Sequence, residues 1–323
     1  MNNTNRNSGL VNVRYDKFAG LDNSNDPVKF ATGEKGIKLS VASNVNISRT
    51  MSVERRDGYS LWKSGQYKSL WGNGKVCYAL EYTALDRNLV EINADKTSTV
   101  LFRGVGNFPV SFVDARNGFV YFTNGIFTGK IKNGSVTMIK GTDTEPTTSD
   151  QFKGSLPAGD FLSFLSPRVL VARKNVLYIS DAVNRDIYHT HMGFLQFDSD
   201  IRMIAPVGNS MFVSDSYNTW FLRKMQSQLD LPTPMFKMEK TASYPSIQGN
   251  PVKAVDGIKT GIAIYNDAAM WASTKGICIG NSEGVFENIT EDRYDMPAST
   301  QMAYCTHREI NDLNLFITAI KGM

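Results

Sequence analysis

The feature that most constrains this chain is the rhythm of its apolar residues. Val, Ile, Phe and Tyr gather in runs of a few residues, and clusters of Asn, Asp, Gly and Ser separate these runs. This pattern is typical of strands and turns. One stretch of helix-forming composition, residues 220–231, begins as a strand and ends before Pro232. The sequence therefore predicts an all-β fold.

Three Asn-Gly pairs mark tight reversals of the chain. They are Asn73-Gly74, Asn117-Gly118 and Asn133-Gly134, each between apolar runs. Asn-Gly supplies the positive φ angles of a type I′ turn, so each pair predicts a hairpin. Hairpin neighbours are antiparallel, which favours meanders over parallel βαβ units.

A degenerate repeat follows from aligning an apolar strand, a polar pair and a second strand. Six copies are found, beginning near residues 76, 120, 177, 211, 277 and 313. Their spacing is uneven, but its mean is close to the ~40–50 residues of a four-stranded propeller blade. We expect a β-propeller of antiparallel hairpin repeats with about six blades, five or seven also being possible.

The last repeat has no room for outer strands before the C-terminus. We expect N-terminal strands near residues 37–62 to close the ring, because closure removes exposed sheet edges. This predicts an N-terminal extension over 1–36 and a propeller domain over 37–323. Surface excursions are expected near 141–160 and 232–252, which are rich in turn-forming residues.

Composition excludes several classes of protein. Hydrophobic residues make up 41% and charged residues 20%, which is typical of a globular chain. The net charge of +4 arises from 35 basic and 31 acidic residues spread along the sequence, unlike a nucleic-acid groove. Three distant cysteines form no disulfide framework. No signal peptide and no run of ~18 apolar residues is present, so we expect cytosolic synthesis without a membrane anchor.

Candidate chemistry is sparse. His189 and His191 share a strand face, as do Cys305 and His307, but no further metal ligands accompany either pair. No nucleophile elbow or phosphate-binding loop occurs. We expect no catalytic residue, no metal and no cofactor. The acidic clusters at 198–200 and 291–295 are interpreted as solvated turns, although two converging carboxylates would make a glycan-degrading enzyme.

Aromatic residues make up 11% of the chain, and most lie in strands that a blade core would bury. A lectin-like propeller would instead use them as sugar platforms. The tryptophans can serve in this way only if they cluster at one end of the ring. They are Trp62, Trp71, Trp220 and Trp271.

The N-terminal segment carries the most specific signature. It opens with Phe18-Ala19-Gly20-Leu21-Asp22-Asn23. An Asn-rich strand comes next, and it is followed by a turn and by a second strand that ends in Arg-Arg-Asp-Gly-Tyr. The signature residues are Asn44, Asn46, Arg55, Arg56, Gly58 and Tyr59. This opening resembles the β-propeller virion proteins of tailed bacteriophages, in the tail nozzle or packaged-DNA-stabilisation class. Asp57 stands where that class often has Pro.

The resemblance implies a structural component of a bacteriophage tail, a nozzle or hub-type protein, and no enzyme. Its expected partners are copies of itself in a closed ring, a hexamer, together with a head–tail adaptor and other tail proteins. Genomic DNA would pass transiently through the channel of the ring. The protein would reside in the virion tail after synthesis and assembly in the host cytoplasm. The alternative is a carbohydrate-binding propeller, either a receptor-binding tail protein or a lectin.

Overall fold

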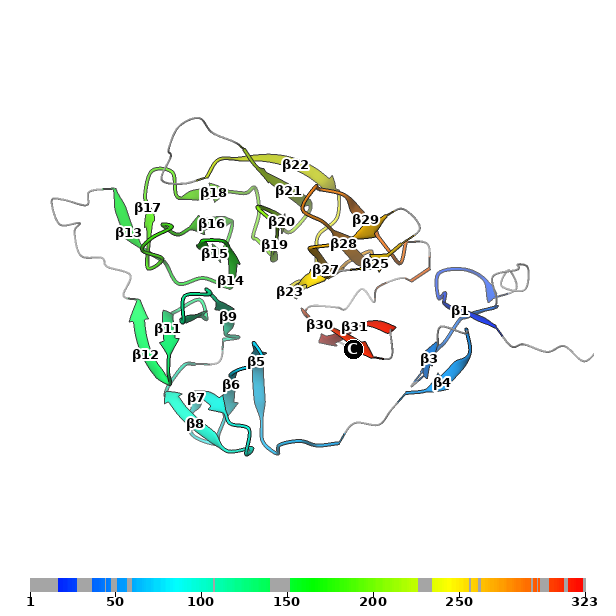
Figure 1. The fold of residues 1–323 in the computed structure, drawn as a ribbon, viewed down its shortest axis with the longest axis horizontal. Coiled ribbons are helices and arrows are strands. Elements are labelled where there is room, and N and C mark those ends of the chain that lie inside the picture. Colours follow the sequence, from blue (N-terminus) through cyan, green and yellow to red (C-terminus); the bar gives the residue numbers. More distant parts are fainter. Residues whose placement is uncertain are drawn as a thin grey trace, which may run out of the picture.

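The computed structural model shows a ring of β-sheets arranged around a centre (Figure 1). It describes residues 17–27, 37–43, 45–47, 51–56, 60–106, 108–139, 152–225, 234–255, 257–260, 263–291, 293–294, 296, 302–310 and 313–321. Within these ranges the secondary structure is strand and turn, with no α-helix. Six sheets follow one another around the ring as blades, which confirms the prediction of a six-bladed β-propeller.

The first two blades are antiparallel meanders of four strands each, and the innermost strand comes first. The first blade contains β5 (Tyr67–Gly72), β6 (Cys77–Tyr82), β7 (Arg87–Ile92) and β8 (Ser98–Phe102). The second contains β9 (Ser111–Asp114), β10 (Val120–Thr123), β11 (Thr128–Lys132) and β12 (Ser135–Ile139).

The next three blades repeat the meander with longer connections. The third contains β14 (Phe161–Leu165), β15 (Arg168–Arg173), β16 (Val176–Ile179) and β18 (Phe194–Gln196). The fourth contains β19 (Met203–Val207), β20 (Ser210–Ser214), β21 (Thr219–Lys224) and β22 (Phe236–Ala242). The fifth contains β24 (Val252–Val255), β27 (Ala268–Ser273), β28 (Gly276–Gly280) and β29 (Phe286–Asn288).

The core lies between the faces of neighbouring blades. Side chains of the fourth and fifth blades meet around Phe212, whose ring centroid is 5.2 Å from that of Trp271. Gly280 permits this approach, because a Cβ there would lie 2.4 Å from the Phe212 ring. Similar apolar clusters join the first blade to the second, the second to the third and the third to the fourth. Strand alternation thus buries both faces of the second, third and fourth blades.

The sixth blade corrects the expected closure. It consists of β23 (Gln248–Asn250), β30 (Met302–Ile310) and β31 (Leu313–Lys321), with β23 parallel to β30. In the described part of the chain no N-terminal strand joins this sheet. The reason is that the segment before the fifth blade supplies the third strand, and residues 302–321 form a long hairpin of their own.

The N-terminal strands lie beside the sixth blade and outside the ring of blades (Figure 1). β1 (Phe18–Leu21) pairs in parallel with β2 (Ile37–Leu39), and β3 (Val45–Ile47) pairs antiparallel with β4 (Val53–Arg55). Each pair is a sheet of two strands. Residues 1–16, the start of the predicted extension, lie outside the described residues.

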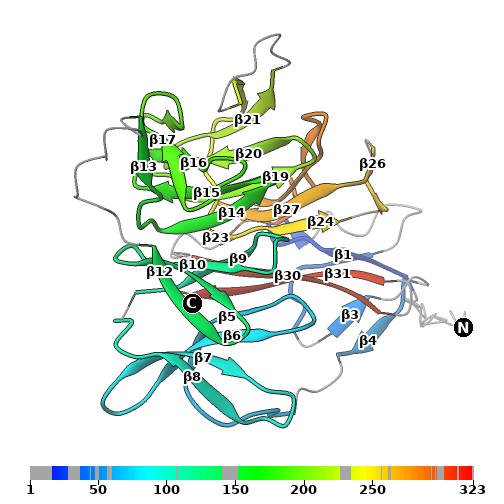
Figure 2. The same cartoon turned by 60° about the vertical axis from the view of Figure 1, so that its left-hand side comes forward.

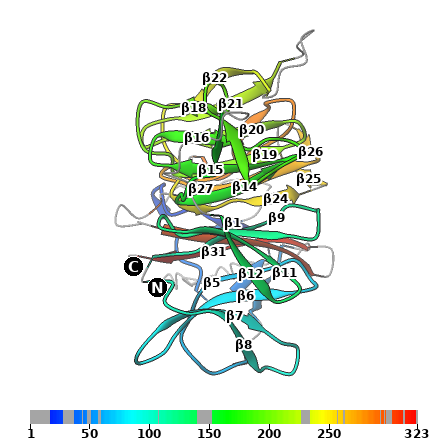
Figure 3. The same cartoon turned by 90° about the vertical axis from the view of Figure 1, so that its left-hand side faces the viewer.

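The two expected surface excursions contribute strands. In the first, the described part contains β13 (Lys153–Ser155), which pairs with β17 (Ile187–His189), and Leu156 is buried. The second contains β22, the outer strand of the fourth blade, and β23. A small ladder of β25 (Ile258–Lys259) and β26 (Ile264–Tyr265) extends from the fifth blade. Figures 2 and 3 show the blades from the side.

All three Asn-Gly pairs lie in hairpin turns, as predicted, but only one has the expected geometry. Asn133 and Gly134 both have positive φ, 48° and 75°, as a type I′ turn requires. At the other two turns the glycine has positive φ, and the asparagine side chain accepts backbone N–H groups of the turn instead. These are Asx turns.

Candidate functional site

The signature residues fall partly within the described structure. Asn46 lies on β3, Arg55 ends β4, and Arg56 follows it. The Arg56 Nε donates to Asn46 Oδ1 at 3.4 Å, so the two strands bring these side chains together. Both arginines are exposed. Asn44, Gly58 and Tyr59 lie outside the described residues.

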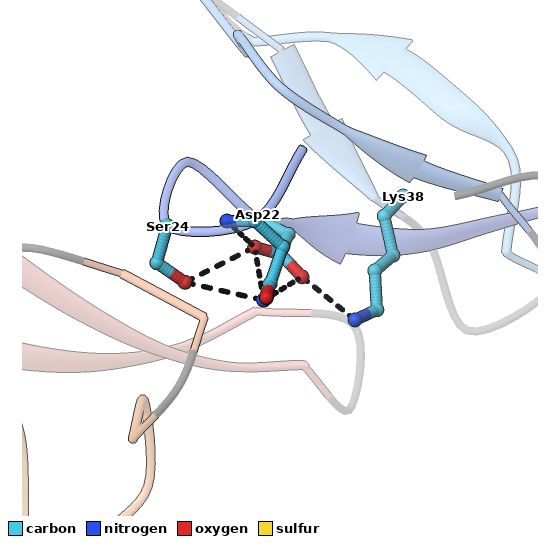
Figure 4. Close-up of polar contacts among 4 residues, drawn as sticks. Asp22, Ser24 and Lys38 are labelled. Atoms are coloured by element: carbon cyan, nitrogen blue, oxygen red, sulfur yellow. Dashed lines mark hydrogen bonds and ion pairs between the residues drawn. The ribbon is translucent and has the colours of Figure 1, made fainter. Parts of the chain in front are cut away.

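Asp22, in the Phe18–Asn23 part of the N-terminal signature, anchors this segment. The Asp22 side chain is fully buried and accepts a hydrogen bond from Lys38 Nζ at 2.7 Å (Figure 4). Ser24 Oγ and the backbone N–H of Asn25 also donate to Asp22 Oδ1, at 3.2 and 3.1 Å. The ammonium of Lys38 is the main reason that the pKa of Asp22 is lowered to about 2.

The same segment is fastened to the propeller by its backbone. The N–H of Asn23 donates to the carbonyl of Arg293 at 2.9 Å, just after the fifth blade. The N–H of Asp22 donates to the carbonyl of Leu39 at 2.8 Å. The Asp22 cluster therefore holds β1, β2 and the flank of the ring in one arrangement.

The centre of the ring contains a lysine. Lys253 on β24, in the fifth blade, donates from Nζ to Ser163 Oγ on β14, in the third blade, at 2.5 Å. β19, the inner strand of the fourth blade, comes between β14 and β24 in chain order, so this side chain links two blades that are not neighbours in sequence. No carboxylate lies within 4 Å of its ammonium among the described residues. Burial lowers the pKa of Lys253 to about 8.

A small hollow opens where the inner strands β9 and β14 begin. Its volume is about 50 Å³, and Trp71, Phe112, Asp160, Gly249 and Tyr304 are among its lining residues. Such a volume accommodates a few waters. This hollow is therefore too small for a large ligand.

A larger cleft lies between the first and second blades, where their inner strands end. Its volume is about 590 Å³, within the range of small-molecule sites. The three predicted Asn-Gly turns meet at this cleft. Its lining includes Asn73, Glu91, Asp114, Asn133 and Gly134. Asn73 Nδ2 donates to Asp114 Oδ2 at 2.8 Å.

Three cations also line this cleft: Lys75, Arg116 and Lys132. All three are exposed, and none has a carboxylate within 4 Å in the described part of the chain. On the cleft floor, burial, and secondarily the charge of Glu91, raises the pKa of Tyr78 to about 12. The arrangement combines hydrogen-bonding side chains with unpaired positive charge.

The histidine and cysteine pairs do not converge. His189 Nε2 lies 3.1 Å from Asp181 Oδ2, whereas the His191 ring packs on Phe152 at 4.7 Å. Cys305 contacts Thr318. Among the residues that the structure describes, no three potential metal ligands form a group.

The tryptophans are spread around the molecule. Trp71 lines the central hollow, Trp220 donates to Asp215 Oδ2 at 2.8 Å, and Trp271 is buried between blades. They belong to the first, fourth and fifth blades, and the condition for a tryptophan sugar platform is therefore not met by these three.

Within the described ranges, no helix has the length and apolarity needed to cross a bilayer.

Comparison with known proteins gives a fold-level likeness only. No family model matches the chain, and no curated protein matches it. A solved Lactobacillus plantarum protein is 13% identical, with 80% of each chain covered and a TM-score of 0.45. Apo AztD from Citrobacter koseri is 11% identical, with 68% of this chain and 61% of that chain covered and a TM-score of 0.35. The Pan2 WD40 domain of Neurospora crassa is also 11% identical, with 74% and 82% covered and a TM-score of 0.33.

Proposed function

We propose that this chain is a structural subunit of a bacteriophage tail, of the nozzle or hub type, which acts by assembly and not by catalysis. The observation that carries the proposal is the placement of the N-terminal strands. The segment that resembles tail proteins forms two sheets of two strands each, outside the ring. Sheets of two strands are marginally stable alone, and their open edges favour pairing with another chain.

Exposed apolar side chains in the same region support an interface. Val41, Leu61 and Trp62 are exposed to 78%, 81% and 51%. Contact with a partner would remove these apolar side chains from water. We expect them to be covered by neighbouring copies in a closed ring, a hexamer, and by the head–tail adaptor and other tail proteins.

We expect genomic DNA to pass along the axis of the assembled ring. The hollow between the inner strands of one propeller, with a volume of about 50 Å³, is too small for it. The near balance of 35 basic and 31 acidic residues fits weak contact with phosphates, since each neutralised phosphate strengthens binding.

The proposal is tested on phage particles released by the bacterial cells in which this chain is made. Antibodies against the purified chain, with gold labels, should decorate the tail just below the head in electron micrographs. Labels confined to cell debris, with the chain absent from purified particles by mass spectrometry, would overturn it. The virion tail is the expected location.

The cleft between the first two blades favours a second candidate, a carbohydrate-binding propeller. Amide and carboxylate side chains around about 590 Å³ suit hydroxyl-rich ligands, and the unpaired cations suit acidic sugars. An array of neutral and acidic oligosaccharides tests this with the wild type, Arg116→Ala and the distant control Lys240→Ala. Binding lost only in Arg116→Ala supports the lectin, and no binding by the wild type refutes it.

A further inference from the structure

The sixth blade is one strand short. Each of the other five blades has four strands, whereas β23, β30 and β31 make three. β31 is the third strand of this blade, and in each of the other blades a fourth strand pairs with the third. Among the described residues its outer edge has no partner strand. Alternate residues of such an edge direct N–H and C=O groups away from the sheet.

β31 also differs from the other outermost strands in length. It spans nine residues, and Lys321, its last, is its one charged residue. β18 and β29 have three residues each, β8 and β12 have five, and β22 has seven residues with three charges. Proteins usually keep unpaired edges short or charged to prevent pairing with other chains. β31 is therefore the edge best suited to accept a strand.

A donor strand is present in the same chain. β4 pairs with β3 on one side, and its other side has no described partner. All three residues of β4 are exposed. Its open edge thus offers N–H and C=O groups that can pair with those of the β31 edge.

The donor of one copy is held away from its own acceptor. The Asp22–Lys38 pair and the bond from Asn23 to Arg293 fasten the N-terminal segment to the flank of the ring. There β4 stays paired with β3 and not with β31. A strand from a second copy meets no such restraint.

We propose that the β4 edge of a neighbouring copy pairs with β31 and completes the sixth blade. The inference rests on the proposed assembly and names the contact that builds it. Donation from each copy to the next is a head-to-tail contact, which closes into a ring when the rotation fits. Main-chain hydrogen bonds supply the attraction, as in other cases of strand addition.

The experiment measures amide hydrogen exchange of the full chain at low and high protein concentration, beside its oligomeric state by native mass spectrometry. The test variant is Val53→Pro, which removes an N–H from β4. The matched control is Ala42→Pro, in an exposed non-strand part of the same segment. Neither residue belongs to a blade, so both variants should melt as the wild type does.

We expect β31 amides to exchange at least tenfold more slowly in the oligomer of the wild type and of Ala42→Pro. In Val53→Pro both this protection and the oligomer should be lost. An oligomer in which β31 exchanges as fast as in the monomer would overturn the strand donation and leave the proposed function standing. A protein that never forms an oligomer would contradict both.

Discussion

Lys253 shows how a single residue depends on the closed ring. In an extended chain its ammonium is hydrated, but in the fold it lies between inner strands with one hydroxyl partner from Ser163. Sequence reasoning gave no reason to choose it among 35 basic residues, because its surroundings arise only when the fifth blade faces the third. The ion pair of Asp22 could not be predicted for the same reason, since Lys38 is its partner only after β1 and β2 pair.

The lowered pKa of Lys253 predicts how stability depends on pH. The folded value is about 8, against an ordinary value of 10.5, so between these values the unfolded chain binds more protons than the folded one. The free energy of unfolding should therefore gain a rising contribution from pH 8 to 10.5. At about 1.4 kcal/mol per pKa unit, the gain is of order 3 kcal/mol.

Urea unfolding of the wild type and Lys253→Met across this range measures the contribution by difference. The wild type should gain stability relative to the variant as the pH rises, whereas the exposed control Lys240→Met should follow the wild type. Parallel curves for the wild type and Lys253→Met would contradict the burial of a charged lysine at the centre.

Asp22 gives a pH dependence of the same sign, in the acid range. Its pKa is lowered from 3.8 to about 2, chiefly by Lys38, so its contribution is present above pH 4 and is lost as the pH falls toward 2. Asp22→Asn should accelerate hydrogen exchange of residues 17–27 at neutral pH, while Asp198→Asn, in an exposed turn, should leave it unchanged. Equal protection in Asp22→Asn and the wild type would show that the ion pair does not hold this segment.

At the scale of elements, the sequence repeat predicted the number of blades, although the structural feature that it marks differs from the one expected. Four of its copies end in Asn124, Asp181, Asp215 and Asn281, and each of these side chains accepts backbone N–H groups two to four residues later. The repeat therefore marks a strand followed by an Asx turn. Each of the six blades contains one copy, which is why counting copies predicted the number of blades.

The position of the repeat within a blade could not be predicted. The copies at β10 and β20 are second strands, whereas those at β16 and β28 are third strands. A local turn motif satisfies its own hydrogen bonds and carries no information about which strand lies innermost. The three strands of the sixth blade could not be predicted from a local motif either. The short β23 pairs with β30, which is more than fifty residues away in sequence.

The Asx turn at Asp215 allows a direct test of its energy. This buried carboxylate accepts hydrogen bonds from the backbone of Tyr217 and Asn218 and from Trp220 Nε1. Asp215→Ala leaves these donors unsatisfied and should lower the free energy of unfolding by about 3 kcal/mol. Asp215→Asn keeps an acceptor for the two backbone groups and should lose less than half as much. If urea unfolding shows that both variants lose the same free energy of unfolding, the hydrogen bonds to the two backbone N–H groups do not supply this stability.

At the scale of the whole molecule, the ring of blades and the N-terminal strands have different roles. The blades bury apolar side chains between them and need no partner to do so. The N-terminal strands bury little and leave sheet edges open. The all-β ring followed from strand and turn patterns, but the place of the N-terminal strands outside it did not, because a strand pattern does not specify its partner.

Assembly of the N-terminal strands with other copies is the central claim, and imaging tests it most directly. Cryo-electron microscopy of the purified full-length chain, with class averages viewed along the symmetry axis, shows whether copies associate and how. Closed rings of propellers around an open axis, six copies to a ring, are the expected result. Single propellers at every protein concentration, with no closed ring in any class, would contradict the structural role.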